Sequence, residues 1–427
     1  MSASPNAGIE SETSQSIESP AVSSLYPWAV VAMLFPVALL NYLDRMMIAT
    51  MRASIRADIP SIDSETKFSF LMAVFMWVYA AMSPVGGFLA DRFSRRWMVI
   101  SSLFVWSLMT WLTGFAQTFT QMAWTRALMG VSEAFYIPAA LALIADFHPG
   151  PTRSRAIGIH TSGIYAGQAF GGLGGYIADT SSWRNAFYWF GAVGIVYAVL
   201  LLAALRDSKG AKEHGPHQNV NLGRTLRILL GTGPFLILVI YFTLQGIPGW
   251  AVKNWLPTFL ATHFHLKQGP AGMSATGYVT IASFAGALIG GTLADLAARK
   301  TLRGRVYVSA LGMGFCVPAL LGLGNVSSLG MAIGCMMLFG LGFGFVDANN
   351  MPILCQLARP EYRATGYGLM NMASIGTGAV VTMALGAMRD RHMSLGVAFL
   401  ISAVLAALAL GLILCIRPPK NGPACPI

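Results

Sequence analysis

The segment 41–45, Asn-Tyr-Leu-Asp-Arg, places an acid beside a base in the first long apolar run of the chain, residues 28–51. At the centre of a membrane-spanning helix each such charge costs about 2.5–3.5 kcal/mol. Ionisable residues at that depth are rare and usually face a cavity or an ion pathway. Asp44 and Arg45 therefore mark the first candidate functional site.

The two side chains suit different chemistry. Burial disfavours the charged form of Asp44 and a nearby arginine favours it, so a balanced site could take up and release a proton. Arg45 keeps its proton and offers a fork of donors that fits a carboxylate, so we expect it to bind an anionic group. Neighbouring residues on a helix point about 100° apart, so only one of the two is expected to reach a central cavity. The alternative is a fixed Asp–Arg pair that only holds helices together.

A second pair of charges lies in the fourth apolar run. Arg126 and Glu133 are seven residues apart, which places them on one helix face two turns apart. Gly130 lies between them and permits close approach by another helix. Glu133 is the second candidate for proton exchange, and Pro138 is expected to kink the helix beyond it. An internal Arg–Glu pair with a purely structural role is the alternative.

Other polar side chains inside apolar runs complete the candidate binding site. His160 could titrate near neutral pH, although a plain hydrogen bond is the commoner role of a lone histidine. Lys253 could bind an anion or extend to the membrane interface. Most of the others suit recognition of hydroxyl groups. The full set of binding candidates is Asn41, Tyr42, Arg45, Arg126, Tyr165, Gln168, Gln245, Lys253, Asp347, Asn350 and Asn371.

Composition places the whole chain in a membrane. Of its 427 residues, 55% are hydrophobic and 11% are charged, and the mean hydropathy is +0.60. Soluble domains carry about 25% charged residues. A spanning helix needs about 20 mainly apolar residues, and we therefore expect an all-α membrane protein with twelve transmembrane helices. The twelve runs lie near 28–51, 68–90, 97–116, 119–145, 155–178, 184–205, 230–261, 273–296, 305–324, 328–353, 363–387 and 394–416. Gly246, Pro248 and Gly249 are expected to break the seventh run.

The distribution of lysine and arginine predicts the orientation. With both chain ends in the cytoplasm, the loops on that side carry 18 basic residues and the opposite loops carry 7. The net charge of +11 therefore reflects membrane orientation and not binding of nucleic acid. The longest polar stretch divides the chain into two six-helix halves. The expected domains are a disordered tail at 1–24, a first half at 25–205, a cytoplasmic linker at 206–229, a second half at 230–416 and a tail at 417–427.

An internal repeat supports this division. The sequence Gly-Phe-Leu-Ala-Asp-Arg-Phe-Ser-Arg-Arg at 87–96 recurs as Gly-Thr-Leu-Ala-Asp-Leu-Ala-Ala-Arg-Lys at 291–300, an offset of 204. Two parallel six-helix repeats are a known design of membrane transporters. Charged residues at these loops are expected to pair with helix ends and so hold one conformation. The candidate gate residues are Asp91, Arg92, Arg95, Arg96, Asp146, Asp295 and Arg299.

The twelve runs, the central linker and the doubled loop motif resemble the major facilitator superfamily. Within it, the motifs at 41–45, Trp106-Ser107, 126–133 and Trp183-Arg184 are similar to those of the anion:cation symporter branch. This resemblance implies a symporter that moves a small organic anion, foremost a sugar acid, together with protons by alternating access. Arg45 would then bind the anion, and Asp44 and Glu133 would exchange the protons.

The Asp44-Arg45 and Glu133-Ala134 features also resemble Spinster-like transporters. That alternative implies proton-dependent transport of a lysolipid or another amphipath. The chain departs from the usual loop motif at Ser94, where the family has glycine, and at Leu296, where a basic residue is common. The second departure suggests that Asp295 and Arg299 mainly hold the second gate. A membrane sensor that does not transport and an uncoupled facilitator are further alternatives.

No pattern in the sequence indicates an enzyme. The five cysteines form no CxxC pair, and there is no phosphate-binding loop or nucleophile arrangement. We therefore expect no metal and no cofactor, with protons as the coupling ion. The expected partners are a small organic anion, protons and the lipid bilayer, and not nucleic acid. The expected location is the plasma membrane, or the inner membrane of a bacterial cell, with the protein acting as a monomer.

Overall fold

The computed structural model describes residues 25–90, 92–148, 150, 152–207, 222–359 and 362–418. Across these residues the chain forms sixteen α-helices and no strand, which confirms the all-α prediction. The helices are α1 (Tyr26–Thr50), α2 (Arg52–Asp58), α3 (Glu65–Ala90), α4 (Arg95–Thr113), α5 (Phe119–Glu133), α6 (Tyr136–Phe147), α7 (Arg153–Phe170), α8 (Leu173–Thr180), α9 (Trp183–Ala204), α10 (Leu222–Leu230), α11 (Gly233–His263), α12 (Gln268–Lys300), α13 (Gly304–Gly324), α14 (Leu329–Leu357), α15 (Arg363–Asp390) and α16 (Leu395–Leu414).

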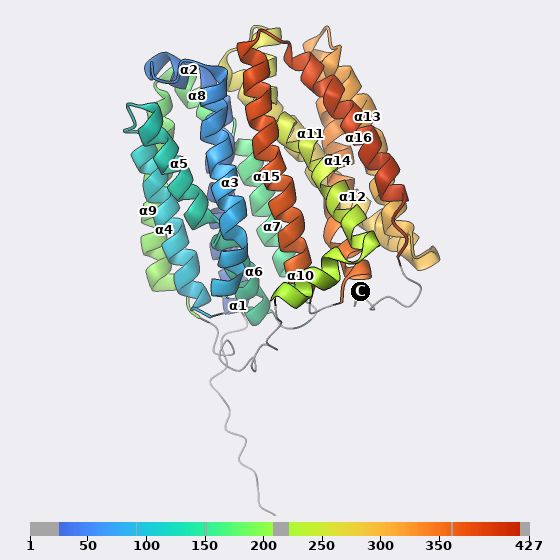
Figure 1. Ribbon diagram of the computed structural model, residues 1–427. Helices are drawn as coiled ribbons and strands as arrows, with labels where there is room; N and C mark the ends of the chain where they lie inside the picture. Colours follow the sequence, from blue (N-terminus) through green and yellow to red (C-terminus); the bar gives the residue numbers. More distant parts are fainter. Residues whose placement is uncertain are drawn as a thin grey trace, which may run out of the picture.

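Most of these helices stand side by side in one bundle (Figure 1). In the described part of the chain, ten stretches are long and apolar enough to cross a membrane: α1, α3, α5 with α6, α9, and each helix from α11 to α16. The predicted runs 97–116 and 155–178 correspond to α4 and to α7 with α8, which are not among those ten. The count of twelve spanning helices therefore stays a prediction.

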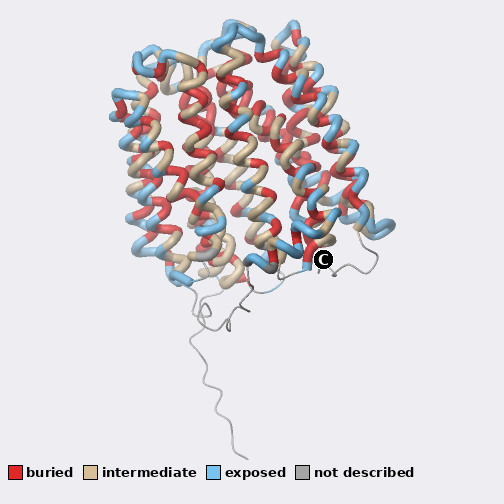
Figure 2. Tube along the Cα trace, viewed as in Figure 1, coloured by how far each residue is buried: buried red, intermediate tan, exposed pale blue. Residues whose placement is uncertain are grey.

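The outer surface of the bundle is apolar. Large side chains such as Val196, Leu288 and Val404 are 59%, 60% and 60% exposed, and Figure 2 shows exposed positions along the flanks of the outer helices. In water such a surface would be costly, because apolar area gains free energy when it leaves water. The same surface is compatible with hydrocarbon, so the arrangement is that of a multi-pass membrane protein.

The fourth predicted run is an interrupted helix, as Pro138 indicated. α5 ends at Glu133 and α6 begins at Tyr136, with Pro138 in the first turn of α6. Proline fits this position because the first turn of a helix has no partners for its backbone N–H groups. The interruption leaves Glu133 as the last helical residue of α5.

The structure differs from the prediction in the seventh apolar run. The expected break at Gly246, Pro248 and Gly249 does not interrupt the helix, because α11 is continuous from Gly233 to His263 with Pro248 inside it. Neighbouring helices supply the packing that a lone proline-containing helix would lack. Gly246 lies so close to α15 that a Cβ atom there would stand 2.2 Å from the Ser374 hydroxyl oxygen.

We refer to α1–α9 as the first half and to α11–α16 as the second half. The halves meet where α3 packs against α15 and where α7 and α8 pack against α12. The described chain starts and stops at one end of the bundle, the terminus end, which also carries α10; the other end, the α2 end, carries α2 and α8 (Figure 1). The predicted tail at 1–24, residues 419–427 of the predicted tail at 417–427, and residues 208–221 of the predicted linker lie outside the described residues.

A carboxylate from the second half caps a helix of the first half at the α2 end. Asp390, the last residue of α15, accepts hydrogen bonds from the backbone N–H groups of Glu65 and Thr66 at 2.7 and 2.9 Å. It also accepts one from the Thr66 hydroxyl at 2.5 Å. Both N–H groups belong to the first turn of α3, which has no helical acceptors of its own. Asp390 therefore acts as a capping residue across the boundary between the halves.

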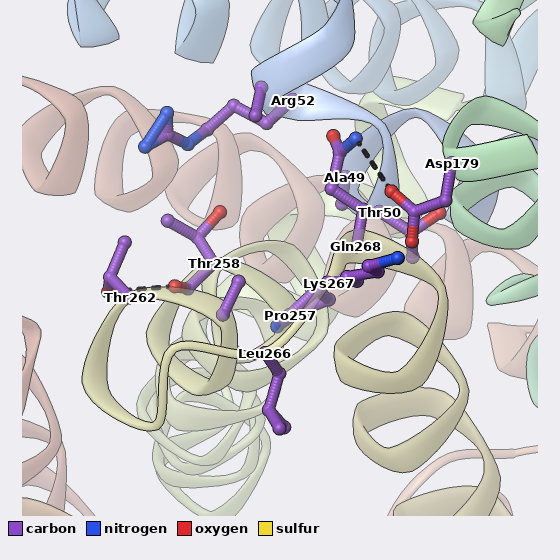
Figure 3. Close-up of a pocket in the computed structure, with 12 residues that line it drawn as sticks. Ala49, Thr50, Arg52, Asp179, Pro257, Thr258, Thr262, Leu266, Lys267 and Gln268 are labelled. Atoms are coloured by element: carbon purple, nitrogen blue, oxygen red, sulfur yellow. Dashed lines mark hydrogen bonds between the residues drawn. The ribbon is translucent and has the colours of Figure 1, made fainter.

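The reciprocal contact joins α8 to α12. Asp179 of the first half accepts hydrogen bonds from the Gly269 N–H at 2.6 Å and from Nε2 of Gln268 at 3.3 Å, both in the first turn of α12 (Figure 3). Lys267, at the N-cap of α12, makes no capping hydrogen bond with its own side chain. Gly172 permits this approach, because a Cβ there would stand 2.4 Å from the Met273 nitrogen. Each half therefore caps one helix of the other.

A cavity of about 300 Å³ lies beside the second cap, between α1, α2, α11 and α12. Arg52, Thr258 and Gln268 are among its lining residues (Figure 3). Gln268 also exchanges hydrogen bonds with Ser54 of α2: its Oε1 accepts from the Ser54 N–H at 3.1 Å, and its Nε2 donates to the hydroxyl at 2.6 Å. The α2 end is therefore held together by polar contacts that link both halves.

Replacing Asp390 by asparagine should weaken the contact between the halves. The amide still reaches the α3 N-terminus, but it is a weaker acceptor than a carboxylate, so we expect a loss of about 1 kcal/mol. Asp179→Asn should act similarly, and the double variant should show the sum because the two caps share no residue. The midpoint of thermal denaturation of the purified protein in detergent measures the effect.

Asp63→Asn is the matched control, because Asp63 is an exposed acid that pairs with Lys67 at 2.7 Å within the first half. We expect its midpoint to stay near that of the unmodified protein. Equal midpoints for Asp390→Asn and Asp63→Asn would show that the cap does not hold the halves together.

Candidate functional site

The second cavity, of about 390 Å³, lies between the halves at mid-depth. Its lining includes Leu141 of α6, a helix that lies towards the terminus end, and Ile157, which is near the start of α7 (Figure 1). The cavity therefore extends from mid-depth towards the terminus end. Eight of the predicted binding residues line it: Tyr42, Arg45, Tyr165, Gln168, Gln245, Lys253, Asp347 and Asn371.

Arg45 and Glu133 form an ion pair at the first-half wall of this cavity. The Arg45 Nε donates to the Glu133 Oε2 at 2.5 Å, and the exposed fractions of the two side chains are 8% and 0%. Arg45 lines the cavity, whereas Glu133 lies behind it at the end of α5. The arginine is therefore held by its acid on one side and faces open space on the other. Removing the charge of Glu133 would leave the guanidinium available to an anion in the cavity.

Aromatic rings complete the surroundings of Arg45. Its guanidinium carbon lies 4.4 Å from the centre of the Tyr79 ring, 4.7 Å from Tyr42 and 5.3 Å from Phe75. Such contacts stabilise a cation and exclude water from the ion pair. Tyr79 lines the cavity but is absent from the predicted site, since one tyrosine in an apolar helix gives no distinctive signal.

Asp44 turns away from the cavity, as the angle between neighbouring helical residues predicted. It is 1% exposed, does not line the cavity and accepts a hydrogen bond from the Thr110 hydroxyl at 3.1 Å. Asp44 and Arg45 form no ion pair with each other among the described contacts. In the described structure, Oδ1 of Asp44 and Oε1 of Glu133 are buried without a hydrogen-bond donor. An unpartnered carboxylate oxygen is costly when charged, so binding of a proton at either group would relieve that cost.

Arg126 shares the interior of the first half but does not line the cavity. It is 1% exposed, its Nε donates to the Leu71 carbonyl at 3.4 Å, and its guanidinium carbon lies 4.7 Å from the centre of the Phe75 ring. Within the described residues no carboxylate stands within 4 Å of it, so Glu133 pairs with Arg45 and not with Arg126. The predicted role of Gly130 is confirmed, because a Cβ there would stand 2.7 Å from the Phe75 oxygen.

The second half contributes Lys253 and Asp347 to the opposite wall. Asp347 accepts a hydrogen bond from the Tyr165 hydroxyl of the first half at 3.3 Å, so this contact crosses the cavity. The Lys253 Nζ lies 5.4 and 5.6 Å from the ring centres of Trp250 and Phe343. Lys253 therefore faces the cavity.

Some predicted residues lie elsewhere, and some lining residues were not predicted. Asn41 and Asn350 are buried but do not line the cavity. His160 lines it and shares a hydrogen bond of 2.9 Å with the Tyr136 hydroxyl, which matches the plain structural alternative. The polar lining residues absent from the predicted set are Tyr79, Thr161, Thr276, Thr280, Ser283, Tyr367 and Ser374. Hydroxyl groups of this kind are common in spanning helices, so only the fold identifies them.

The predicted gate residues pair within the halves. Arg95 forms an ion pair with Asp146, which confirms that Asp146 meets the basic loop. Arg96 donates from its guanidinium to the Leu202 carbonyl at 2.5 Å. In the second half Asp295 pairs with Arg305 at 2.6 Å, and Arg305 was not among the predicted gate residues. Arg92 and Arg299 are exposed, and Asp91 lies outside the described residues. The gate role of this set stays a prediction.

A double-mutant cycle on Arg45 and Glu133 tests the buried ion pair. Glu133→Leu leaves a buried arginine without its acid, and Arg45→Met leaves a buried acid without its arginine. We expect each single variant to lose about 3–5 kcal/mol of stability. The combination of Arg45→Met with Glu133→Leu removes both charges and should recover much of that loss. Thermal denaturation in detergent checks this, and a double variant whose loss equals the sum of the single losses would contradict a direct pair.

Curated relatives resemble this chain over different lengths. Protein spinster homolog 1 of Xenopus tropicalis is 31% identical over 251 residues, which cover 56% of this chain and 47% of that protein. The probable galactarate/D-glucarate transporter GudP of Escherichia coli (strain K12) is 25% identical over 394 residues, covering 84% and 86% of the two chains. The probable sulfoacetate transporter SauU of Cupriavidus necator is 27% identical over 390 residues, covering 85% and 87%.

A solved structure and a family model agree on the architecture. The crystal structure of a bacterial homolog to the human lysosomal transporter Spinster, in an inward-facing and unoccupied conformation, superposes with a TM-score of 0.74 at 20% identity. That match covers 93% of this chain and 99% of the other and shows the common fold. The model of the Major Facilitator Superfamily matches residues 34–374. With the apolar bundle and its central cavity, these findings establish that the chain belongs to the Major Facilitator Superfamily of membrane transporters.

Proposed function

We propose that this transporter is a proton-coupled symporter of a small organic anion, foremost a sugar acid, and works by alternating access. The observation that carries the proposal is the Arg45–Glu133 ion pair at the wall of the central cavity. An arginine there suits an anionic cargo, and its acid partner can be neutralised by a proton. The curated names of GudP and SauU, which are transporters of organic anions, support the same substrate class.

The proposed arrangement in the membrane has twelve spanning helices. α4 and the pair α7 and α8 would cross the bilayer beside the ten more apolar stretches, because they pack inside the same bundle. Both chain ends would lie in the cytoplasm, as the excess of 18 basic residues over 7 indicates. The proposed location is the plasma membrane, or the inner membrane of a bacterial cell, with a monomer as the working unit.

In this orientation the caps of Asp390 and Asp179 would close the outer side. The cavity, which extends towards the terminus end, would face the cytoplasm. The structure would then represent an inward-facing state, and transport would require both caps to open while the terminus end closes. The two halves, 25–205 and 230–416, would move largely as units about the cavity.

Coupling would follow from competition for Arg45. With Glu133 ionised, the arginine is occupied at 2.5 Å and binds an anion poorly. When Glu133 takes a proton, the pair weakens and Arg45 can donate to the anion instead. Asp44 lies outside the cavity with Thr110 as its hydrogen-bond donor and would be the second proton site. Its Oδ1, like Oε1 of Glu133, is buried without a hydrogen-bond donor in the described structure.

One observation favours a second candidate function, the transport of an amphipath. The second-half wall of the cavity carries the rings of Phe242, Trp250, Phe339 and Phe343, which could hold an apolar tail. Protein spinster homolog 1 is among the relatives, and the superposed structure is that of a bacterial Spinster homolog. Uptake into proteoliposomes with sugar acids and lysolipids as competitors separates the two. Competition by lysolipids alone would favour the amphipath.

Neutralising either proposed proton site should remove the driving force from uptake. We expect Asp44→Asn and Glu133→Gln to abolish accumulation driven by a pH gradient, because neither amide takes up a proton at physiological pH. Exchange of internal for external sugar acid should persist, since it needs no net proton movement. Proteoliposomes with and without an imposed pH gradient measure both activities.

Asp63→Asn serves again as the control, because it removes an exposed acid far from the cavity. Gradient-driven uptake by Asp44→Asn at the unmodified rate would remove Asp44 from the coupling mechanism. The same result for Glu133→Gln would remove Glu133.

Arg45→Ala should weaken binding of the anion. A charge-assisted hydrogen bond contributes about 1.5 kcal/mol or more, so the dissociation constant should rise at least about tenfold. Calorimetric titration of the purified protein with a sugar acid checks this. Unchanged affinity would assign the anion contact to another cation, and Lys253 is the one that also lines the cavity.

A further inference from the structure

The cavity has a cation on each of its two walls. Arg45 belongs to α1 of the first half, and Lys253 belongs to α11 of the second half. Each has an acid in its surroundings, since Glu133 pairs with Arg45 and Asp347 lines the cavity together with Lys253. Each half therefore places one cation at the central cavity, with an acid near it.

The two cations differ in how well they are neutralised. Arg45 lies 2.5 Å from a carboxylate oxygen. Lys253 has no carboxylate within 4 Å in the described part of the chain, and its ammonium group lies over the faces of Trp250 and Phe343 at 5.4 and 5.6 Å. Aromatic faces stabilise a cation only partly, and a desolvated ammonium group that lacks an anion is costly. In the state described, Lys253 is therefore the wall cation that is ready to take a negative group.

Both cations line the same cavity, so their like charges repel each other. Two like charges in a volume of about 390 Å³ lose that repulsion when a ligand with two negative groups lies between them. The walls also carry Asp347, with the Tyr165 hydroxyl 3.3 Å away, and the amides of Gln168 and Asn371. Carboxylate and amide oxygens accept hydrogen bonds from hydroxyl groups, so the middle of the cavity suits a hydroxylated chain.

We propose that the cargo is a hydroxylated dianion, with one negative group at Lys253, the other at Arg45 and its hydroxyl groups at Asp347, Gln168 and Asn371. This inference rests on the proposed function and names the substrate class within it. Lys253 would be a specificity residue that distinguishes a cargo with two anionic ends from one with a single anionic end. The Lys253 end would bind first, and the Arg45 end would follow when Glu133 takes a proton.

Two sugar acids with the same carbon chain provide a matched pair of probes. D-Glucarate has a carboxylate at both ends, whereas D-gluconate has a hydroxyl group in place of one of them. We expect the purified protein to bind D-glucarate at least about tenfold more tightly, since one further charge-assisted contact corresponds to that factor. Calorimetric titration in detergent measures both dissociation constants. Equal affinities, or tighter binding of D-gluconate, would overturn the inference without using any variant.

Lys253→Met tests the residue itself. We expect the affinity ratio between the two probes to fall about tenfold, because the second anionic contact is lost. Lys253→Arg keeps the charge and should preserve the preference for D-glucarate. Lys300→Met is the matched control, since Lys300 is an exposed residue that does not line the cavity. An unchanged ratio in Lys253→Met would overturn the assignment, and should that variant fail to fold, Lys253→Gln replaces it with a polar side chain.

The outcomes separate this inference from the proposed function. If the protein binds several sugar monoanions but a second carboxylate does not increase the affinity, the proposed function stands and the dianion inference is wrong. If the protein binds no sugar acid, with either one or two carboxylates, the proposed substrate class is wrong and so is the dianion inference. Preference for D-glucarate that disappears in Lys253→Met supports both.

Discussion

A guanidinium group inside an apolar bundle requires a counter-charge, and much of the first half is arranged around that requirement. Arg45 and Glu133 meet at 2.5 Å, from helices that are far apart in the sequence. The interruption of the helix after Glu133 and the rings of Tyr42, Phe75 and Tyr79 keep the pair in place. Removing one partner of a buried pair costs far more than removing both. A proton on Glu133 would therefore leave Arg45 as a cation without a counter-charge at the cavity wall.

The need of a buried charge for a counter-charge also concerns the charged residues that lie outside the central cavity. Asp44 and Arg126, like Glu133, are buried and do not line the cavity, so a ligand there would not contact them. They contribute through the local electrostatic field, which in a medium of low dielectric constant extends over many ångströms. The cavity wall itself carries one cation from each half, and this symmetry of charge mirrors the repeat in the sequence.

The sequence predicted the parts of this arrangement that depend on local geometry. Charged residues inside apolar runs identified Arg45 and Glu133 as site candidates. The angle between neighbouring helical residues predicted that only one of Asp44 and Arg45 would reach the cavity. Spacing along one helix placed Arg126 on the same face as Glu133, but it could not show that Arg45 would be the partner. That choice depends on how α1 packs against its neighbours. Tertiary packing also decided that α11 continues past Pro248, against its local tendency to break.

Contacts between the halves were beyond prediction from the sequence alone. Neither Asp179 nor Asp390 lies in a distinctive motif, and each serves as a cap only because another helix begins beside it. Hydroxyl groups such as those of Ser374 and Tyr367 became part of the site for the same reason. The partner of Asp295 was missed in the same way, because Arg305 lies outside the repeated motif at 291–300 and meets Asp295 only in the folded chain.

The paired caps have a consequence for the empty molecule. Their hydrogen bonds involve backbone N–H groups and two exposed-edge acids, none of which lines the central cavity. In the proposed alternating-access cycle, their strength would enter the free-energy difference between the inward-facing and outward-facing states of the empty protein. It would not enter the intrinsic affinity of either state for a ligand. Evolution could in this way adjust which side of the bilayer the vacant protein favours, and hence its apparent affinity from each side, while leaving the residues that recognise cargo unchanged.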